Sequence, residues 1–420
     1  DRLLPGLIDE MQVFRIEPFD SAQAISVLGF AADYFTQNER VHVAASAAQE
    51  TYHLFHRFQP YVAFPGKAIQ LMGTVVDQKV QERKNEVTPN DIRREFGAMT
   101  GLPDVFLRED IPLPFENIEK TFNDRIFGQS EAVSQVCRTI TKFKAGLNDP
   151  GRPIGVMLFV GPTGVGKTQM AKQMGDYLFP NKPVKDRLIR LDMSEYAGHD
   201  ASERLLGNVL GRPSDLVQKI RANPFSIVLL DEIEKASYDV FDVLMNVFDE
   251  GRLTDPLGRV TRFNSALLVM TSNLGATTSG PMGFSEEENE ERPAVHTDLS
   301  AVKNFFRPEF FNRIDHVISF EPLGKSIIRE ITRLELGSID LREGVQDRKL
   351  TLLFTDEVVA ALAKLGFDPA YGVRPLQRVI EEHIVLPLAR RLVGEPLREK
   401  TVHFDWDPDS KRVTMNELGS

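Results

Sequence analysis

The chain has 420 residues, too many for a single compact core, and its 42% hydrophobic and 26% charged residues are typical of a globular protein. Its formal net charge of −11 argues against a nucleic-acid binder, which would carry a basic footprint. The longest apolar runs are strand-sized, which argues against a membrane span, and the only cysteine, Cys137, indicates a reducing compartment such as the cytoplasm. The first residues, "DRLL", lack a methionine, so we interpret the chain as a piece of a longer protein.

Residues 1–100 are expected to be mainly helical. The stretches "SAQAISVLGFAADYF" and "AASAAQETYHLFHRF" place apolar residues three and four positions apart, as amphipathic helices do. In "TPNDIRREF", Thr88 or Asn90 is the expected N-cap of a further helix. Residues 101–120 mix prolines with charged residues and are interpreted as an interdomain linker.

Residues 121–322 predict an α/β domain. Five short apolar runs alternate there with longer helical segments, which implies a parallel sheet covered by helices on both faces. The five expected strands are "GVMLFV", "RLIRL", "SIVLL", "ALLVMT" and "HVISF". Residues 323–420 return to helices and end in two expected strands, "TVHFDW" and "RVTMNE", which predicts a small α+β domain.

The segment "GPTGVGKT" (161–168) fits the phosphate-binding pattern G-x-x-x-x-G-K-[ST] in full, and it stands between an expected strand and an expected helix. Glycines let backbone N–H groups curl around phosphate oxygens, and the helix N-terminus adds a favourable dipole. Lys167 would reach the β- and γ-phosphates of ATP, and Thr168 would bind Mg²⁺. The expected nucleotide-binding residues of this loop are Gly161, Pro162, Thr163, Gly164, Val165, Gly166, Lys167 and Thr168.

Acidic residues follow a second expected strand in "SIVLLDEIEK" (226–235). Asp231 at the strand end would help to hold Mg²⁺, and Glu232 would act as general base toward the attacking water. Asn273, after the strand that ends in "VMTSN", could orient that water. Arg307, Arg313 and Arg374 are candidates for stabilising the charge that develops on the γ-phosphate; a lone arginine would more commonly form a surface ion pair.

Together these segments resemble the second ATPase module of the Clp ATPases, which are AAA+ unfoldases and disaggregases that act as hexameric rings on protein substrates. The resemblance rests on "RIFGQSEAV", "GPTGVGKT", "LDMSEY", "LLDEIEKAS", "GRLTDPLGR", "TSNLGA", "FRPEFFNRID" and "LGFDPAYGVRPLQR". Upstream, "FPGKAIQLM" and "VTPNDIRREFGAMTGLP" are similar to the end of the first module and its connector. The resemblance implies an AAA+ P-loop fold with a five-stranded parallel sheet, a small α+β domain after it and a mainly helical small domain before it.

The resemblance also implies roles for single residues. Asn273 matches sensor one, and Arg374 matches sensor two, which reaches the nucleotide from the small domain. Arg313 matches the arginine finger that enters the neighbouring subunit's site, so activity would depend on assembly into a ring. The residues expected beside the adenine are Arg125, Ile126 and Phe127.

Two loops raise separate questions. Members of the family carry a glycine-rich pore loop with an aromatic residue that grips substrate, whereas "NVLGRPSD" (208–215) is shorter and has only Val209 and Leu210 as sizeable apolar residues. Members that act with a peptidase dock on it through an apolar–Gly–apolar tripeptide. Here Met282, Gly283 and Phe284 occupy the corresponding connection, and an incidental flexible loop is the competing interpretation.

Three hypotheses follow from the sequence. The first is an ATP-driven unfoldase or disaggregase of the Clp type that uses ATP and Mg²⁺. The second, motivated by the missing aromatic pore loop, is a non-threading remodelling or regulatory ATPase. The third is an inert scaffold, against which the complete set of nucleotide-site residues argues.

Overall fold

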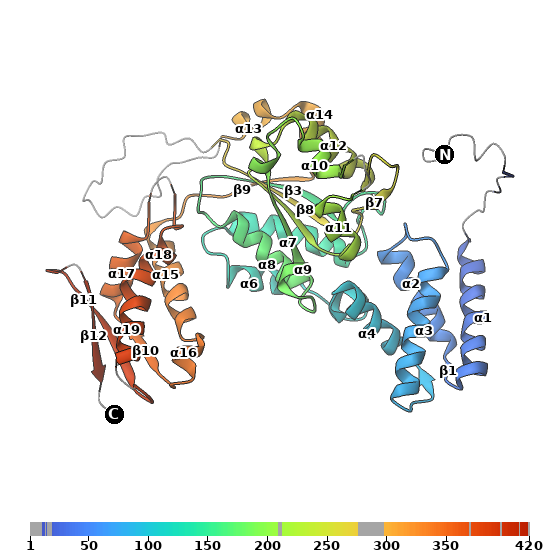
Figure 1. Ribbon diagram of the computed structural model, residues 1–420, viewed down its shortest axis with the longest axis horizontal. Helices are drawn as coiled ribbons and strands as arrows, with labels where there is room; N and C mark the ends of the chain where they lie inside the picture. The colour runs from blue at the N-terminus through green and yellow to red at the C-terminus, as the bar shows by residue number, and fades with distance from the viewer. Residues whose placement is uncertain are drawn as a thin grey trace.

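The computed structural model describes residues 11–12, 14, 19–208, 212–275, 298–368, 371–394, 397–410 and 412–418. Along the chain it shows a helical region, a central α/β region and a C-terminal α/β region (Figure 1). None of the described helices is long and apolar enough to cross a membrane.

The described residues of the helical region form four helices and a short parallel strand pair. Of the two expected N-caps, Thr88 is the one observed, and the Asp91 carboxylate accepts hydrogen bonds from the Thr88 N–H and hydroxyl at 2.9 and 2.7 Å. Lys79 lies 2.7 Å from the same carboxylate, and both side chains are buried. Burial raises the pKa of Asp91, but the bonds from Lys79 and Thr88 prevail and lower it to about 2. The elements are α1 (Ser21–Glu39), β1 (His42–Val43), α2 (Ala45–Phe58), α3 (Gly66–Gln81), β2 (Glu86–Val87) and α4 (Pro89–Thr100).

The stretch 101–120, which the sequence suggested as a linker, is folded against its neighbours. It contains α5 (Asp104–Leu107) and the start of α6 (Phe115–Asn123). Phe106, Leu107 and Ile118 are all buried in the core that also holds residues of α2, α4 and α7 (Ser130–Lys144). The apolar residues between the prolines therefore attach this stretch firmly to the central region.

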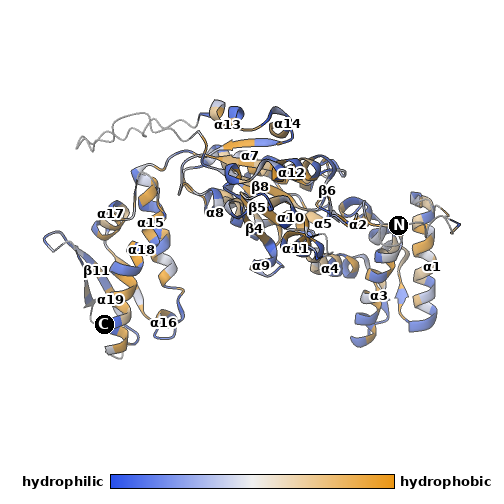
Figure 2. Ribbon diagram, turned by 45° about the horizontal axis from the view of Figure 1, so that its top comes forward, coloured by the Kyte–Doolittle hydropathy of each residue, from blue (hydrophilic) through white to orange (hydrophobic). Residues whose placement is uncertain are grey.

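The central region is built on one parallel sheet with the strand order β4-β5-β8-β3-β9. All five predicted strands are present, and β3, β5 and β8 are buried along their whole length. Their apolar residues give these strands the hydrophobic colour in Figure 2. The bounds are β3 (Gly155–Val160), β4 (Leu188–Asp192), β5 (Ile227–Asp231), β8 (Leu267–Ser272) and β9 (His316–Ser319).

Helices cover both faces of this sheet because successive strand residues point to opposite sides. Along β3, Met157 and Phe159 join one core, whereas Val156, Leu158 and Val160 join the other. A hairpin of β6 (Arg252–Thr254) and β7 (Val260–Arg262), which the sequence analysis missed, follows α12. The remaining elements are α8 (Lys167–Leu178), α9 (Val184–Arg187), η2 (Met193–Tyr196), α10 (Ala201–Leu206), α11 (Asp215–Ala222), η3 (Ile233–Lys235), α12 (Tyr238–Glu250), α13 (Leu299–Phe305) and α14 (Pro308–Phe311).

The C-terminal region packs helices against a three-stranded sheet with the order β10-β11-β12. The two predicted strands are β11 (Thr401–Asp407) and β12 (Arg412–Leu418), and β10 (Thr351–Phe354) pairs in parallel with β11 as an addition that the sequence analysis did not expect. The helices are α15 (Lys325–Ile339), α16 (Glu343–Gln346), α17 (Asp356–Leu365), α18 (Leu376–Ile380), the π-helical turn η4 (Glu381–Val385) and α19 (Leu386–Gly394). The predicted fold class is confirmed.

Candidate nucleotide-binding site

A cavity of about 330 Å³ lies where the carboxyl ends of β3, β5 and β8 meet α15 and α18 of the C-terminal region. Crevices at this edge of parallel sheets are the usual ligand sites of α/β proteins. All but four of the residues predicted for the nucleotide site line the cavity, the exceptions being Gly161, Pro162, Arg307 and Arg313. The lining residues that were predicted are Arg125, Ile126, Phe127, Thr163, Gly164, Val165, Gly166, Lys167, Thr168, Asp231, Glu232, Asn273 and Arg374.

The loop between β3 and α8 has a backbone that only glycine adopts easily. Gly161, Gly164 and Gly166 have φ angles of +146°, +77° and +106°. A Cβ on Gly164 would clash with the Tyr371 carbonyl oxygen, and a Cβ on Gly161 would lie 2.5 Å from the Phe320 carbonyl oxygen. Glycine is therefore favoured because the loop curls with positive φ angles. Gly161 and Gly164 also let the loop pack closely against the backbone of Phe320 and Tyr371.

Lys167, the first residue of α8, is folded back over its own loop. Its Nζ donates to the carbonyl oxygens of Gly161 and Pro162 at 2.6 and 2.7 Å and to Asn273 Oδ1 at 2.9 Å. Burial lowers the pKa of Lys167 to about 8, with the nearby negative charges of Glu234 and Asp231 acting in the opposite direction. Anionic phosphate oxygens could replace the three oxygens that now accept hydrogen bonds from this ammonium group.

Asp231 ends β5 in a polar network. Its Oδ2 accepts two bonds from Arg190 on the neighbouring strand β4, at 3.0 and 2.6 Å. Its Oδ1 accepts the hydroxyl of Thr271 at 2.5 Å. Oδ1 keeps a lone pair, and the Thr168 hydroxyl lines the same cavity, so the residues offer hard oxygen ligands of the kind that suit Mg²⁺. Sequence reasoning found Asp231 but not Arg190 or Thr271.

Glu232 stands in a left-handed turn with φ +57° and ψ +53°, a costly conformation for a residue with a side chain. Its N–H donates to Thr271 Oγ1 at 3.1 Å, and its carboxylate pairs with Lys235 at 2.8 Å. The turn places the Glu232 side chain on the cavity wall. Two residues further, Glu234 Oε1 accepts the backbone N–H of Asn273 at 3.0 Å, which the sequence analysis also missed.

A buried glutamine connects the loop to the chain after β9. Gln129 Nε2 donates to the carbonyl oxygens of Glu321 and Val165 at 2.8 and 3.3 Å, and its Oε1 accepts the N–H of Glu321 at 2.9 Å. Beside it, Ile126 is buried, and Arg125 donates to Gln173 at 3.0 Å. These contacts fix the wall of the cavity where adenine was expected.

Arg374 and Arg313 occupy different places. Arg374 enters the cavity from the C-terminal region, and its guanidinium group has no hydrogen-bond or ion-pair partner among the described residues. Arg313 lies outside the cavity, where it pairs with Asp249 of α12 and donates to the Glu309 carbonyl oxygen at 2.5 Å. Its own carbonyl oxygen accepts a bond from Arg152 at 3.1 Å.

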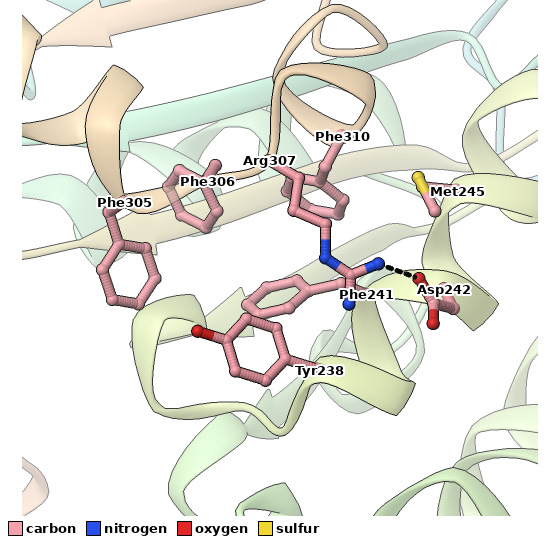
Figure 3. A pocket seen from close by; sticks show the side chains of 8 residues that line it. All are labelled: Tyr238, Phe241, Asp242, Met245, Phe305, Phe306, Arg307 and Phe310. Carbon is pink, nitrogen blue, oxygen red and sulfur yellow. Dashed lines mark hydrogen bonds and ion pairs between the residues drawn. The ribbon is translucent and has the colours of Figure 1, made fainter.

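Arg307 belongs to a separate aromatic cluster. Figure 3 shows its guanidinium group above Tyr238 and directed at Asp242, with Phe305, Phe306 and Phe310 nearby. The distance to Asp242 Oδ1 is 3.0 Å, and the guanidinium carbon lies 5.3 Å from the centre of the Tyr238 ring. Arg307 is therefore held by its contacts with Asp242 and Tyr238 and does not reach the nucleotide cavity.

The short loop after α10 is closed at its base. Gly207 and Pro213 form a β-bridge, and Asn208 exchanges hydrogen bonds with Arg212 at 3.1 and 3.0 Å. Val209 and Leu210 lie outside the described residues, as do Met282, Gly283 and Phe284 of the expected peptidase contact.

Comparisons with known proteins agree with this architecture. Residues 152–317 match the family model described as AAA domain (Cdc48 subfamily), and residues 323–404 match the C-terminal, D2-small domain, of ClpB protein. The ClpB chaperone of Oceanobacillus iheyensis is 40% identical over 326 residues, covering 75% of this chain and 40% of the relative. The ClpB chaperone of Pseudomonas putida is 40% identical over 316 residues, covering 74% and 36%.

A solved structure extends the match over nearly the whole chain. It is the closed-state reconstruction of Hsp104 with ATPγS and FITC casein, with a TM-score of 0.75 and 28% identity, covering 97% of this chain and 70% of that one. The chain spans at most about 40% of the length of these two ClpB relatives. On the fold, the family models and these relatives, the chain belongs to the Clp ATPases and contains their C-terminal AAA domain and small domain.

Proposed function

We propose that this chain binds and hydrolyses ATP in the cavity between the central and C-terminal regions. The observation that carries the proposal is the convergence of Lys167, Glu232, Asn273 and Arg374 from four separate segments on one cavity. The membership of the AAA family and the ATPγS named with the related Hsp104 structure support it.

The side chains have distinct tasks in this proposal. Lys167 exchanges the carbonyl oxygens that it now contacts for β- and γ-phosphate oxygens. Glu232 takes a proton from the attacking water, and Asn273 orients that water. Thr168 and Asp231 would hold Mg²⁺, which neutralises phosphate charge when bound. Arg374 supplies positive charge from the C-terminal region.

The ring is part of the same proposal. Arg313 does not line the cavity of its own chain. It forms an ion pair with Asp249 and donates a hydrogen bond to the Glu309 carbonyl oxygen. A finger in this position can serve the cavity of a neighbouring copy, as the family resemblance implies. Closed rings let every subunit give and receive such a contact, so we propose a hexamer.

The whole protein is proposed to act as a disaggregase on protein substrates in the cytoplasm. The related ClpB proteins are named as chaperones, and the related Hsp104 structure is described with casein. These relatives favour a disaggregase over the non-threading ATPase that the short loop at 208–215 suggested. Docking of a peptidase through Met282, Gly283 and Phe284 stays a prediction from the sequence.

Glu232→Gln tests the hydrolytic assignment. In the full-length protein we expect kcat for ATP to fall by about 100-fold or more while a fluorescent ATP analogue still binds, because only the base is lost. Glu195→Gln is the matched control, since the Glu195 side chain on η2 is 65% exposed. Normal turnover in Glu232→Gln would show that Glu232 is not the base.

A folded fluorescent protein carrying an unfolded tag tests the disaggregase assignment. With ATP, the full-length protein should abolish its fluorescence, and Glu232→Gln should not. ATP consumption with an intact substrate would contradict unfolding and favour the non-threading ATPase.

A further inference from the structure

Glu234 is a half-buried glutamate beside the cavity, and the proposed mechanism leaves it without a task. It belongs to η3, directly after Glu232, and its Oε1 accepts the backbone N–H of Asn273 at 3.0 Å. Its Oε2 is shielded from solvent and has no hydrogen-bond partner among the described residues. Such an oxygen is costly to bury, because the lost hydration is not replaced. A costly group next to a catalytic site is a candidate for a functional role.

The left-handed turn at Glu232 separates the two glutamates. Glu232 lines the cavity, whereas Glu234 is absent from the lining and faces the end of β8 through its bond to Asn273. Glu234 therefore has no route to the nucleotide itself. The hydrogen bond of Glu234 can therefore affect hydrolysis only through Asn273, whereas its negative charge also acts on Lys167.

Asn273 is placed to pass that effect on. Its Oδ1 accepts Nζ of Lys167 at 2.9 Å and the hydroxyl of Thr163 at 3.4 Å. Asn273 follows the last residue of β8, so the strand pairing ends before it. The bond from Glu234 supplies the backbone anchor that the sheet no longer gives. A continuous path of hydrogen bonds thus runs from Glu234 through Asn273 to Lys167.

We propose that Glu234 is a positioning residue for ATP hydrolysis, which holds Asn273 in the place from which its amide can meet the phosphate and the attacking water. The proposal rests on the ATP hydrolysis proposed above. A charged acceptor suits the task, because hydrogen bonds to a carboxylate are stronger than those to a neutral oxygen. A purely structural glutamate would instead affect binding, turnover and stability together.

The test uses the full-length protein with Glu234→Met, which fills similar space without an acceptor, and Glu234→Gln, which keeps an acceptor oxygen. ATP turnover gives kcat and KM, and a fluorescent ATP analogue gives the dissociation constant in a Glu232→Gln background. For Glu234→Met we expect kcat to fall about 10- to 100-fold, with the dissociation constant within about threefold of the parent. Glu234→Gln should restore kcat to within about threefold of wild type.

A double-mutant cycle with Asn273→Ala supplies the second readout. If Glu234 acts through Asn273, adding Glu234→Met to Asn273→Ala should slow turnover no further. The inference would be overturned if the two substitutions together reduced kcat by the product of their single effects, or if Glu234→Met kept the wild-type kcat. Failure of both Glu234→Met and Glu234→Ala to fold would also overturn it, because the residue would then serve the fold.

The two proposals fail in different ways. A wild-type protein that binds but never hydrolyses ATP would overturn the proposed function. An active wild type with a fully active Glu234→Met variant would overturn only the role of Glu234.

Discussion

Gly372→Ala should displace the C-terminal region from the nucleotide loop. Gly372 has φ +61°, and a Cβ there would lie 2.5 Å from the Thr163 carbonyl oxygen and 3.0 Å from Gly164 Cα. Ordinary contact begins near 3.4 Å, so the two backbones must separate by about 0.9 Å. The left-handed φ adds roughly 1–2 kcal/mol of strain for alanine. Both effects oppose the closed arrangement of the cavity.

The displacement should reach Arg374, two residues further along the chain. Arg374 enters the cavity from this turn, and a misplacement of about 1 Å can cost roughly 100-fold in rate. We therefore expect kcat for ATP to fall about 10- to 100-fold in Gly372→Ala. Because Gly372 itself does not line the cavity, the loss would come from geometry rather than from a missing contact to nucleotide.

The assay is steady-state ATP turnover of the full-length protein, with Gly337→Ala as the control. Gly337 lies exposed within α15, has no atom within 4 Å of a built Cβ, and should tolerate alanine without loss. A wild-type kcat and KM in Gly372→Ala would refute the claim that this contact between the two regions positions Arg374.

Two further predictions test the assembly and a buried lysine. Arg313→Ala should keep ATP binding but lose about 1000-fold or more in the rate of ATP hydrolysis. Mixing these subunits with Lys167→Ala subunits should restore part of the hydrolysis, because the intact cavity of one subunit then meets the intact arginine finger of the other. A complete lack of recovery would contradict the trans role. Burial lowers the pKa of Lys182 to about 8, so the unfolded state binds more protons between about pH 8 and 10.5, and stability should rise with pH across that window. In urea unfolding, the free energy of unfolding of the wild type relative to Lys182→Met should rise by up to about 3 kcal/mol between about pH 8 and 10.5. A difference that does not change with pH would contradict the shift.

The sequence predicts the central sheet well because its strands are continuous apolar runs that end at polar residues. Runs such as 155–160 and 227–230 are buried along their whole length, and no polar residue interrupts them. The acidic pair stands at the end of one such run, where Asp231 is the last residue of β5, and Asn273 follows β8 directly. Their meeting at one edge of the sheet follows from parallel pairing, and could be predicted without coordinates.

The features that the sequence did not predict depend mainly on contacts between residues that are far apart along the chain. Gln129 contacts Glu321 across 192 residues of sequence, and Arg152 contacts Asp315 across 163. Strand β10 has only four residues, and its partner β11 begins fifty positions later. No local spacing encodes such pairs, because they depend on which segments the tertiary fold brings together. Glu234 was overlooked for another reason, since it stands beside two acids that already accounted for the chemistry.

The contacts between the central and C-terminal regions link nucleotide binding to the placement of the C-terminal region. Gly372 abuts the loop backbone at Thr163 and Gly164, and Gln129 bonds both that loop and Glu321 before the C-terminal region begins. A phosphate group bound by this loop would therefore favour the placement of the C-terminal region that fits the loop. By reciprocity, whatever holds that region in place must tighten nucleotide binding to the same extent. A neighbouring copy that contacts the C-terminal region would act on ATP affinity through this route, independently of Arg313.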